Sequence, residues 1–177
     1  MMLRLLFIVL GLIGFSTNAD AQLQSSQAGE FKQAKYFAGF SKPFLSNGTF
    51  LLSDEQLLWQ VTHPVSSKLL VKNNEVYVES SQGTLVRQAG AAPFIRVLEA
   101  VIANDESQLL EQFEVLHSDT STCTVLAPKE ALLATLFSTF ELCIRNEHVS
   151  SVRLNEVSGN YTVLSFIFHS NSQKRVK

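Results

Sequence analysis

Hydrophobic and polar positions alternate most clearly between residues 49 and 62. Two such runs are separated by the polar segment Ser-Asp-Glu-Gln, a pattern typical of a β-hairpin. One face of this hairpin is apolar throughout and carries Phe50, Leu52, Leu57, Trp59 and Val61. A surface of this size has to be covered by a core, a partner or a ligand.

Further short strands are expected on both sides of this hairpin. Asn73-Asn74 predicts a tight turn, because asparagine tolerates a positive φ. A polar segment, 22–29, predicts one or two helical turns that end at Gly29. The remaining strands are predicted over residues 30–40, 68–72, 76–80, 84–88, 122–127, 140–145, 149–157 and 161–169.

The periodicity changes to that of a helix at Ala92. Pro93 suits the first helical turn, and apolar residues then follow at helical spacing: Phe94, Val97, Leu98, Val101 and Ile102. Asn104-Asp105 ends this helix and caps a second one, whose apolar face is Leu109, Leu110 and Phe113. A third short helix after Pro128 places Leu132, Leu133, Leu136 and Phe137 together.

This order of elements predicts the α+β class. Antiparallel strands with helices inserted between them favour one large curved sheet with the helices on a single face. The apolar stripes of the helices would then lie against the apolar face of the hairpin.

The N-terminal segment, residues 1–21, is interpreted as a signal peptide that is removed. A short basic start precedes an apolar run, Leu5 to Phe15, and the segment ends in Ala19-Asp20-Ala21, which suits cleavage before Gln22. The alternative is an uncleaved membrane anchor, for which this run is short, since a spanning helix needs about 20 apolar residues. Residues 22–177 are long enough for a single domain with its own core.

Charge and cysteine content narrow the classes of partner. The net charge is −2, which argues against nucleic acid as a partner, because phosphates demand a basic face. Cys123 and Cys143 are the two cysteines, and they lie in neighbouring predicted strands. A disulfide and two free thiols are both compatible with the sequence. Neither state of the two cysteines implies a metal site.

A search for catalytic motifs indicates no enzyme. The chain has no G-x-S-x-G and no H-E-x-x-H pattern, and its four histidines lie in four different predicted segment ends or turns. No glycine-rich loop suits a phosphate group. We therefore expect no catalytic residues, no cofactor and no metal.

The apolar content, with 13 phenylalanines, is compatible with two interpretations of the core. The first is an ordinary core filled by its own side chains. The second is an incompletely filled core, which would bury acyl chains at about 0.8 kcal/mol per CH₂ group.

Several motifs, taken in order, resemble the LolA superfamily of outer-membrane lipoprotein carriers, and most closely its divergent LolA-like branch. The likeness runs through nearly all of residues 22–177, and its order and spacing carry it more than any one motif. The matching stretches are Phe31-x-Gln33-x-Lys35, Lys42-Pro43, Gly48-x-Phe50, Leu57-x-Trp59, LLEQFEV at 109–115, Leu126-Ala127-Pro128-Lys129, Phe140-Glu141-Leu142, Val152-Arg153-Leu154 and Gly159-Asn160-Tyr161-Thr162.

The resemblance implies an unclosed half-barrel whose concave apolar face is lidded by helices. It also implies a periplasmic carrier in a Gram-negative bacterium, which ferries acyl chains of lipoproteins, or other lipids, towards the outer membrane. The donor would be an inner-membrane protein and the acceptor an outer-membrane protein, and we expect a monomer. Matched to the family, the cavity would be lined by Phe50, Leu52, Leu57, Trp59 and Val61, and the lid would contribute Phe94, Leu98 and Val101.

Two features depart from the classical carriers. Those proteins have a basic residue shortly before a proline in this hairpin, where this chain has Leu51-Leu52-Ser53-Asp54. Their N-terminal amphipathic helix is reduced here to the polar segment 22–29. A carrier of a non-lipoprotein lipid, and an interaction protein with the same fold and a filled core, are the alternatives.

Overall fold

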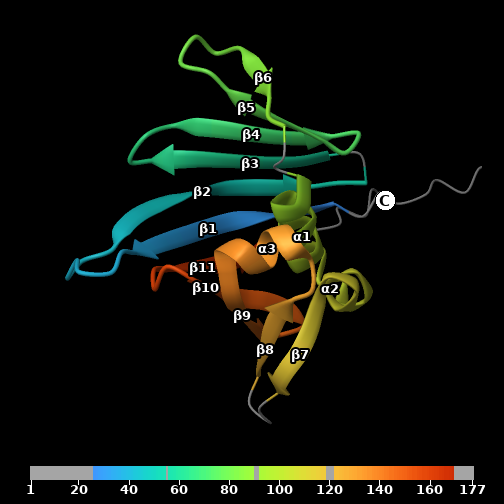
Figure 1. Cartoon of the computed structure of the whole chain (residues 1–177). Coiled ribbons are helices and arrows are strands. Elements are labelled where there is room, and N and C mark those ends of the chain that lie inside the picture. The colour runs from blue at the N-terminus through green and yellow to red at the C-terminus, as the bar shows by residue number, and fades with distance from the viewer. Residues whose placement is uncertain (1–25, 55, 90–91, 119–121, 170–177) are drawn as a thin grey trace, which may run out of the picture.

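The computed structural model describes residues 26–54, 56–89, 92–118 and 122–169 (Figure 1). The signal peptide predicted at residues 1–21 lies outside these ranges. The strands are β1 (Gln27–Tyr36), β2 (Phe44–Leu52), β3 (Gln56–His63), β4 (Ser67–Lys72), β5 (Glu75–Glu79), β6 (Leu85–Arg87), β7 (Phe113–Ser118), β8 (Cys123–Pro128), β9 (Phe137–Arg145), β10 (His148–Glu156) and β11 (Tyr161–Phe168). The helices are α1 (Ala92–Ala103), α2 (Glu106–Gln112) and α3 (Ala131–Leu136).

All strands of the described residues belong to one antiparallel sheet. Its order is β6-β5-β4-β3-β2-β1-β11-β10-β9-β8-β7, so the first and last strands of the chain, β1 and β11, pair at its centre. The two outermost strands, β6 and β7, do not pair with each other, and the sheet remains open. Figure 1 shows it curving around the helices.

The helices lie on the concave side of the sheet. Helix α1 contacts strands from both halves, β2 and β5 on one side and β10 on the other, whereas α3 contacts β8 and β9 (Figure 1). Buried residues of α1, among them Val97, Val101 and Ile102, join the same core as Phe31, Phe50 and Phe166 of the sheet. The predicted fold class, a single curved antiparallel sheet with short helices on its concave face, is confirmed. Among the described residues, no helix has the length and apolar character that crossing a membrane requires.

Several local predictions are also confirmed. Asn73 and Asn74 form the turn between β4 and β5 with φ values of 54° and 60°. Asp105 caps α2, and its side chain accepts a hydrogen bond from the Gln108 amide at 3.1 Å.

The start of the first strand was predicted wrongly. Strand β1 begins at Gln27, so Gly29 lies within the strand and does not end a helix. A Cβ atom at Gly29 would lie 2.3 Å from the Ile167 carbonyl oxygen and 2.7 Å from the Phe50 ring. The glycine is therefore explained by the close approach of β11 and of a large ring, neither of which is visible in the local pattern.

The prediction also missed strand β7. Phe113 was assigned to the apolar face of the second helix, but that helix ends at Gln112 and Phe113 is extended, with φ −130° and ψ 151°. Phe113 is buried opposite Pro128 and packs edge-on against Phe140, with ring centroids 4.8 Å apart. Pairing with β8 therefore overrides the helical spacing of Leu109 and Phe113.

Candidate functional site

The apolar face of the β2–β3 hairpin forms the floor of the concave side. In the β2–β3 register, Phe50 pairs with Trp59 and Leu52 with Leu57, while Val61 lies opposite Gly48. Phe50 and Leu57 are buried, whereas Leu52, Trp59 and Val61 are partly buried against the same core. All five residues predicted for this face thus lie together on the concave side.

An aromatic cluster extends this floor across the centre of the sheet. The Trp59 ring stacks on Phe31 with centroids 3.7 Å apart, and Phe166 meets Trp59 edge-on at 6.3 Å. Phe50 contacts Phe166 and Phe168 at 5.9 and 5.2 Å. Rings in these geometries attract each other beyond the effect of area burial, so this part of the concave face is well packed.

A separate apolar cavity of about 190 Å³ lies between the helices and the second half of the sheet. Three of its lining residues, Phe94, Leu98 and Val101 on α1, are the ones predicted for the lid. The remaining lining side chains are also hydrophobic and come from α1, α3 and strands β9 to β11: Ile95, Val97, Leu133, Phe137, Phe140, Val152, Leu154 and Leu164. A space of this composition excludes polar ligands and suits a hydrocarbon chain.

The sequence-predicted residues therefore fall into two groups. Those of the helix line the cavity, whereas the five of the hairpin form the neighbouring floor and are absent from the cavity lining. The contribution of β9 to β11 was missed. Alternation along Val152 and Leu154, and along Leu164 and Phe166, was the available signal, but it does not show which strands face α1.

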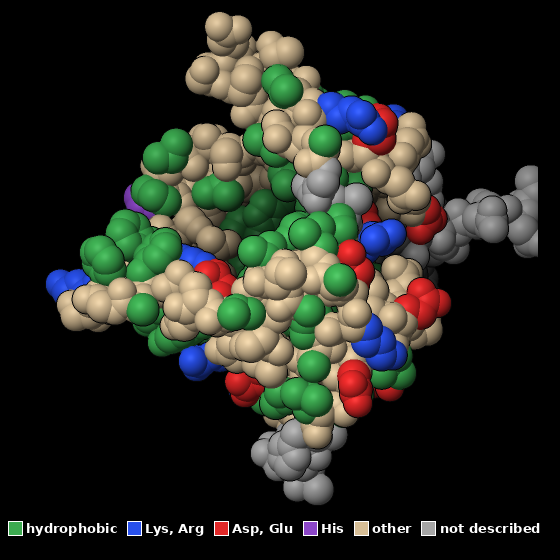
Figure 2. Space-filling view, viewed as in Figure 1, with side chains coloured by type: hydrophobic (Ala, Val, Ile, Leu, Met, Phe, Trp, Pro, Cys, Tyr) green, Lys and Arg blue, Asp and Glu red, His purple; other side chains and the backbone are tan. Residues whose placement is uncertain are grey.

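The concave side is visibly hollowed. Figure 2 shows a depression beside the helices with hydrophobic side chains in its depth and polar atoms around part of its rim. The surface of the molecule thus dips towards the apolar interior at this point.

The two ends of the concave side differ in their polar groups. At one end, an open cleft of about 1000 Å³ is lined mostly by polar side chains, including Asp54, Lys72 and Glu99, and reaches Leu52. Burial raises the pKa of the Glu99 carboxyl above its ordinary value of 4.5. Among the described residues, the Gln27 Oε1 atom in this cleft is buried without a hydrogen-bond donor.

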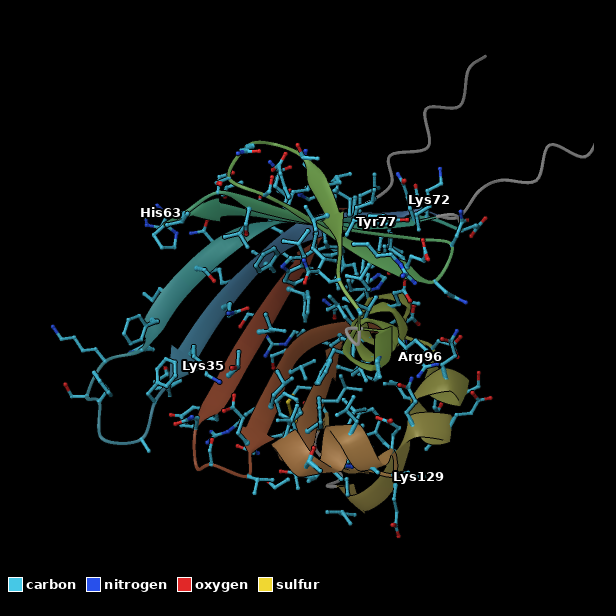
Figure 3. All side chains as sticks on the ribbon, turned by 45° about the horizontal axis from the view of Figure 1, so that its top comes forward. Lys35, His63, Lys72, Tyr77, Arg96 and Lys129 are labelled. Atoms are coloured by element: carbon cyan, nitrogen blue, oxygen red, sulfur yellow. A yellow bond between two sulfur atoms is a disulfide. The ribbon has the colours of Figure 1, made fainter. Side chains whose placement is uncertain are left out.

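At the opposite end, Lys35 on β1 forms an ion pair with Glu156 on β10; Lys35 and Lys72 mark the two ends in Figure 3. Asn160 Nδ2 also donates to the Glu156 carboxylate, at 3.2 Å. Burial lowers the pKa of the Lys35 ammonium from its ordinary value of 10.5. The ion pair thus links β1 to the end of β10 on the concave side, beyond the apolar floor.

The chain offers one cluster with metal-ligand side chains in its described part, made by Cys123, Glu141 and Cys143. The two cysteines form a disulfide between the paired strands β8 and β9. Both sulfur atoms are therefore occupied, and the cluster has only one carboxylate left as a ligand.

Comparison with known proteins gives fold likenesses only. No family model matches the sequence, and no curated protein matches it. A LolA superfamily protein from Nitrosomonas europaea aligns over 82% of this chain and 85% of its own, with a TM-score of 0.48 and 11% identity. A DUF1329 family protein from Desulfovibrio piger aligns over 86% of this chain and 88% of its own, with a TM-score of 0.43 and 9% identity. At such scores and identities, neither likeness bears on what this chain binds.

Proposed function

We propose that this protein is a carrier that buries acyl chains between its curved sheet and the helices α1 and α3. The observation that supports this most directly is the cavity beneath α1, whose lining side chains are all hydrophobic. In this proposal the chain is exported to the periplasm of a Gram-negative bacterium and works there as a monomer. It carries the acyl chains of lipoproteins, or of other lipids, from an inner-membrane donor towards an outer-membrane acceptor, without a cofactor or any chemical step.

Energetics favour burial of even a part of such a chain. Each CH₂ group transferred from water contributes about 0.8 kcal/mol, so eight groups contribute about 6 kcal/mol before ordering costs. Release then requires a partner that favours the open state, since a ligand shifts an equilibrium only by its differential affinity.

The cavity is smaller than the cargo it is proposed to take. Sites for drug-sized ligands usually measure about 300–1000 Å³, whereas this cavity measures about 190 Å³. A complete acyl chain therefore requires α1 to move away from β9 to β11. The depression beside the helices provides the direction from which a chain would enter (Figure 2).

Two substitutions on β11 test the proposal with a matched pair. Leu164 lines the cavity, whereas Ile167 points to the opposite face and is 55% exposed. Leu164→Trp should fill the cavity and weaken binding of a C16 fatty acid at least about tenfold, which corresponds to 1.4 kcal/mol. Ile167→Trp should bind like the wild type.

Binding is measured by native mass spectrometry of delipidated protein titrated with palmitate. Because overpacking a core can cost about 1–3 kcal/mol, the melting temperature of each variant is recorded, and the milder Leu154→Phe serves as a second cavity-filling variant. Failure of the wild-type protein to bind palmitate or a phospholipid would contradict carriage. That result would favour the alternative, an interaction protein whose core is filled.

A further inference from the structure

Three phenylalanine rings project into solvent where β1 is connected to β2. Phe37, Phe40 and Phe44 are 38%, 67% and 60% exposed. They contact one another edge-on, with centroid distances of 5.4 to 6.3 Å. We call Phe37, Phe40 and Phe44 the aromatic tip. Clustered exposed rings of this kind mark an interaction site more often than scattered single residues do.

The aromatic tip is held in place by the surrounding backbone. The Phe40 amide donates to the Phe37 carbonyl at 3.1 Å, and Gly39 supplies the positive φ of 86° that this turn needs. The Ala38 amide donates to Asn160 Oδ1 at 2.9 Å, which ties the loop to the turn between β10 and β11. The rings are thus presented by a structured loop, which Figure 1 shows extending beyond the rest of the sheet.

The charge around the aromatic tip is positive although the chain as a whole is negative. Residues 37–47 contain the exposed Lys42 and no aspartate or glutamate, whereas the whole chain has a net charge of −2. The Lys35 ammonium lies 5.4 Å from the centre of the Phe37 ring, but its ion pair with Glu156 offsets its charge, so Lys42 supplies the excess positive charge. Figure 2 shows hydrophobic side chains gathered at this end with a basic side chain beside them.

We propose that the aromatic tip docks onto the surface of a lipid bilayer that contains anionic headgroups. Aromatic side chains favour the boundary between headgroups and acyl chains, and a neighbouring lysine is attracted to anionic lipids. A projecting convex tip can insert between headgroups without a complementary pocket, which a protein partner would have to supply. The charge complementarity and the projecting shape together favour a bilayer as the occupant.

Docking at this end also has a consequence for the orientation of the molecule. Phe44 lies on the same face of β2 as Phe50, because the two are six positions apart in a strand whose side chains alternate between faces. The aromatic tip therefore lies at one end of the concave face. When the molecule docks, that end of the concave face points towards the bilayer. The inference itself does not depend on lipid carriage, since it concerns only surface binding.

Flotation with lipid vesicles tests the docking. The protein, recovered from the periplasm of a bacterial host, is mixed with vesicles of phosphatidylcholine alone or with 30% phosphatidylglycerol, in about 0.1 M salt. The wild type should float with the anionic vesicles, and Phe40→Ser combined with Phe44→Ser should reduce the bound fraction at least fivefold. Lys42→Glu should weaken binding to the anionic vesicles more than binding to the neutral ones.

The matched control replaces exposed hydrophobic residues elsewhere. Val86 on β6 and Leu116 on β7, the two outermost strands, are 47% and 55% exposed, and Val86→Ser combined with Leu116→Ser should bind vesicles like the wild type. Absence of wild-type binding to both vesicle types, or equal binding of the phenylalanine double variant, would overturn the proposal. The first result would also be the one expected if the tip served a protein partner.

The same variants separate docking from carriage. Leu164→Trp should still float with anionic vesicles, and the phenylalanine double variant should still take up palmitate in solution. If Leu164→Trp abolished flotation, vesicle binding would depend on the cavity, and the proposal that the aromatic tip binds the bilayer would be wrong. Circular dichroism melting of each variant confirms that the fold is kept.

Discussion

Gly48 shows how a single small residue shapes the floor of the site. A Cβ atom there would lie 1.8 Å from the Gln60 carbonyl oxygen and 2.9 Å from the Phe31 ring. The missing side chain lets Phe31 lie over β2, where it stacks on Trp59. The packed aromatic cluster therefore depends on a position that carries no hydrophobic signal of its own.

Glu99 is the residue for which a dependence on pH is expected. It lies half-buried on α1, in the cleft that also contains Asp54 and Lys72. Burial raises its pKa from 4.5, so the folded state binds the proton more tightly than the unfolded state does. Below pH 4.5 the carboxyl is protonated in both states and burial costs little. The free energy of unfolding therefore falls as the pH rises from 4.5 through the raised pKa of Glu99.

Glu99→Gln should therefore raise the melting temperature at pH 7 and leave it nearly unchanged at pH 4. The measurement is thermal unfolding by circular dichroism at both values. Glu111→Gln on α2, an exposed position, serves as the control and should give the same small change at each pH. An equal gain at pH 4 and pH 7 for Glu99→Gln would mean that burial of the charge is not the cause.

At the scale of elements, helix α1 is the part most directly connected with the site. It spans the concave side from β2 and β5 to β10 and supplies a large part of the cavity lining. Helix α3 covers the neighbouring strands β8 and β9 and contributes Leu133, which is fully buried. The cavity is thus bounded by two short helices whose positions depend on different segments of the chain.

The disulfide closes the segment that carries α3. Cys123 on β8 and Cys143 on β9 are 20 residues apart in sequence, and α3 lies between them. Closing a loop of this length stabilises a fold by about 3 kcal/mol, mainly by restricting the unfolded chain.

Cys123→Ala combined with Cys143→Ala should lower the free energy of unfolding by about 3 kcal/mol. Urea denaturation with and without a reductant measures this. The reductant should destabilise the wild type by a similar amount and leave the double variant unchanged. A wild type that is insensitive to complete reduction of its disulfide would contradict this expectation.

At the scale of the whole molecule, the proposed carriage requires the helices and the sheet to separate. The sheet is continuous from β6 to β7, so it can stay intact while α1 moves. Local opening of this kind has a lower free energy than global unfolding and is visible in amide hydrogen exchange.

Bound lipid should therefore protect α1 selectively. If opening of α1 releases the cargo, palmitate at 100 times its dissociation constant should slow exchange of the α1 amides by up to about 100-fold. Exchange in β4, which lies away from the cavity lining, should change much less. Hydrogen exchange with mass spectrometry measures both segments, and equal protection of the two would argue against a moving lid.

Local patterns were sufficient for most of the individual elements. Alternation identified the β2–β3 hairpin and its apolar face, and helical spacing identified Phe94, Leu98 and Val101 on one stripe of α1. These features are encoded in short windows, because side chains repeat every two residues in a strand and every 3.6 in a helix. Strand β7 was not predicted from the sequence, because its pairing with β8 outweighs a local helical spacing of apolar residues.

The sequence by itself determined the class of the fold and the apolar character of its concave face. Only the tertiary structure decided which apolar residues pack against each other and which leave space. Trp59 stacks on Phe31, and both Phe50 and Trp59 contact Phe166 on β11, which is distant in sequence, whereas Leu98, Leu154 and Leu164 line the cavity together. Hydrophobicity favours burial without direction, so the location of a void follows from the curvature of the sheet and from where α1 crosses it.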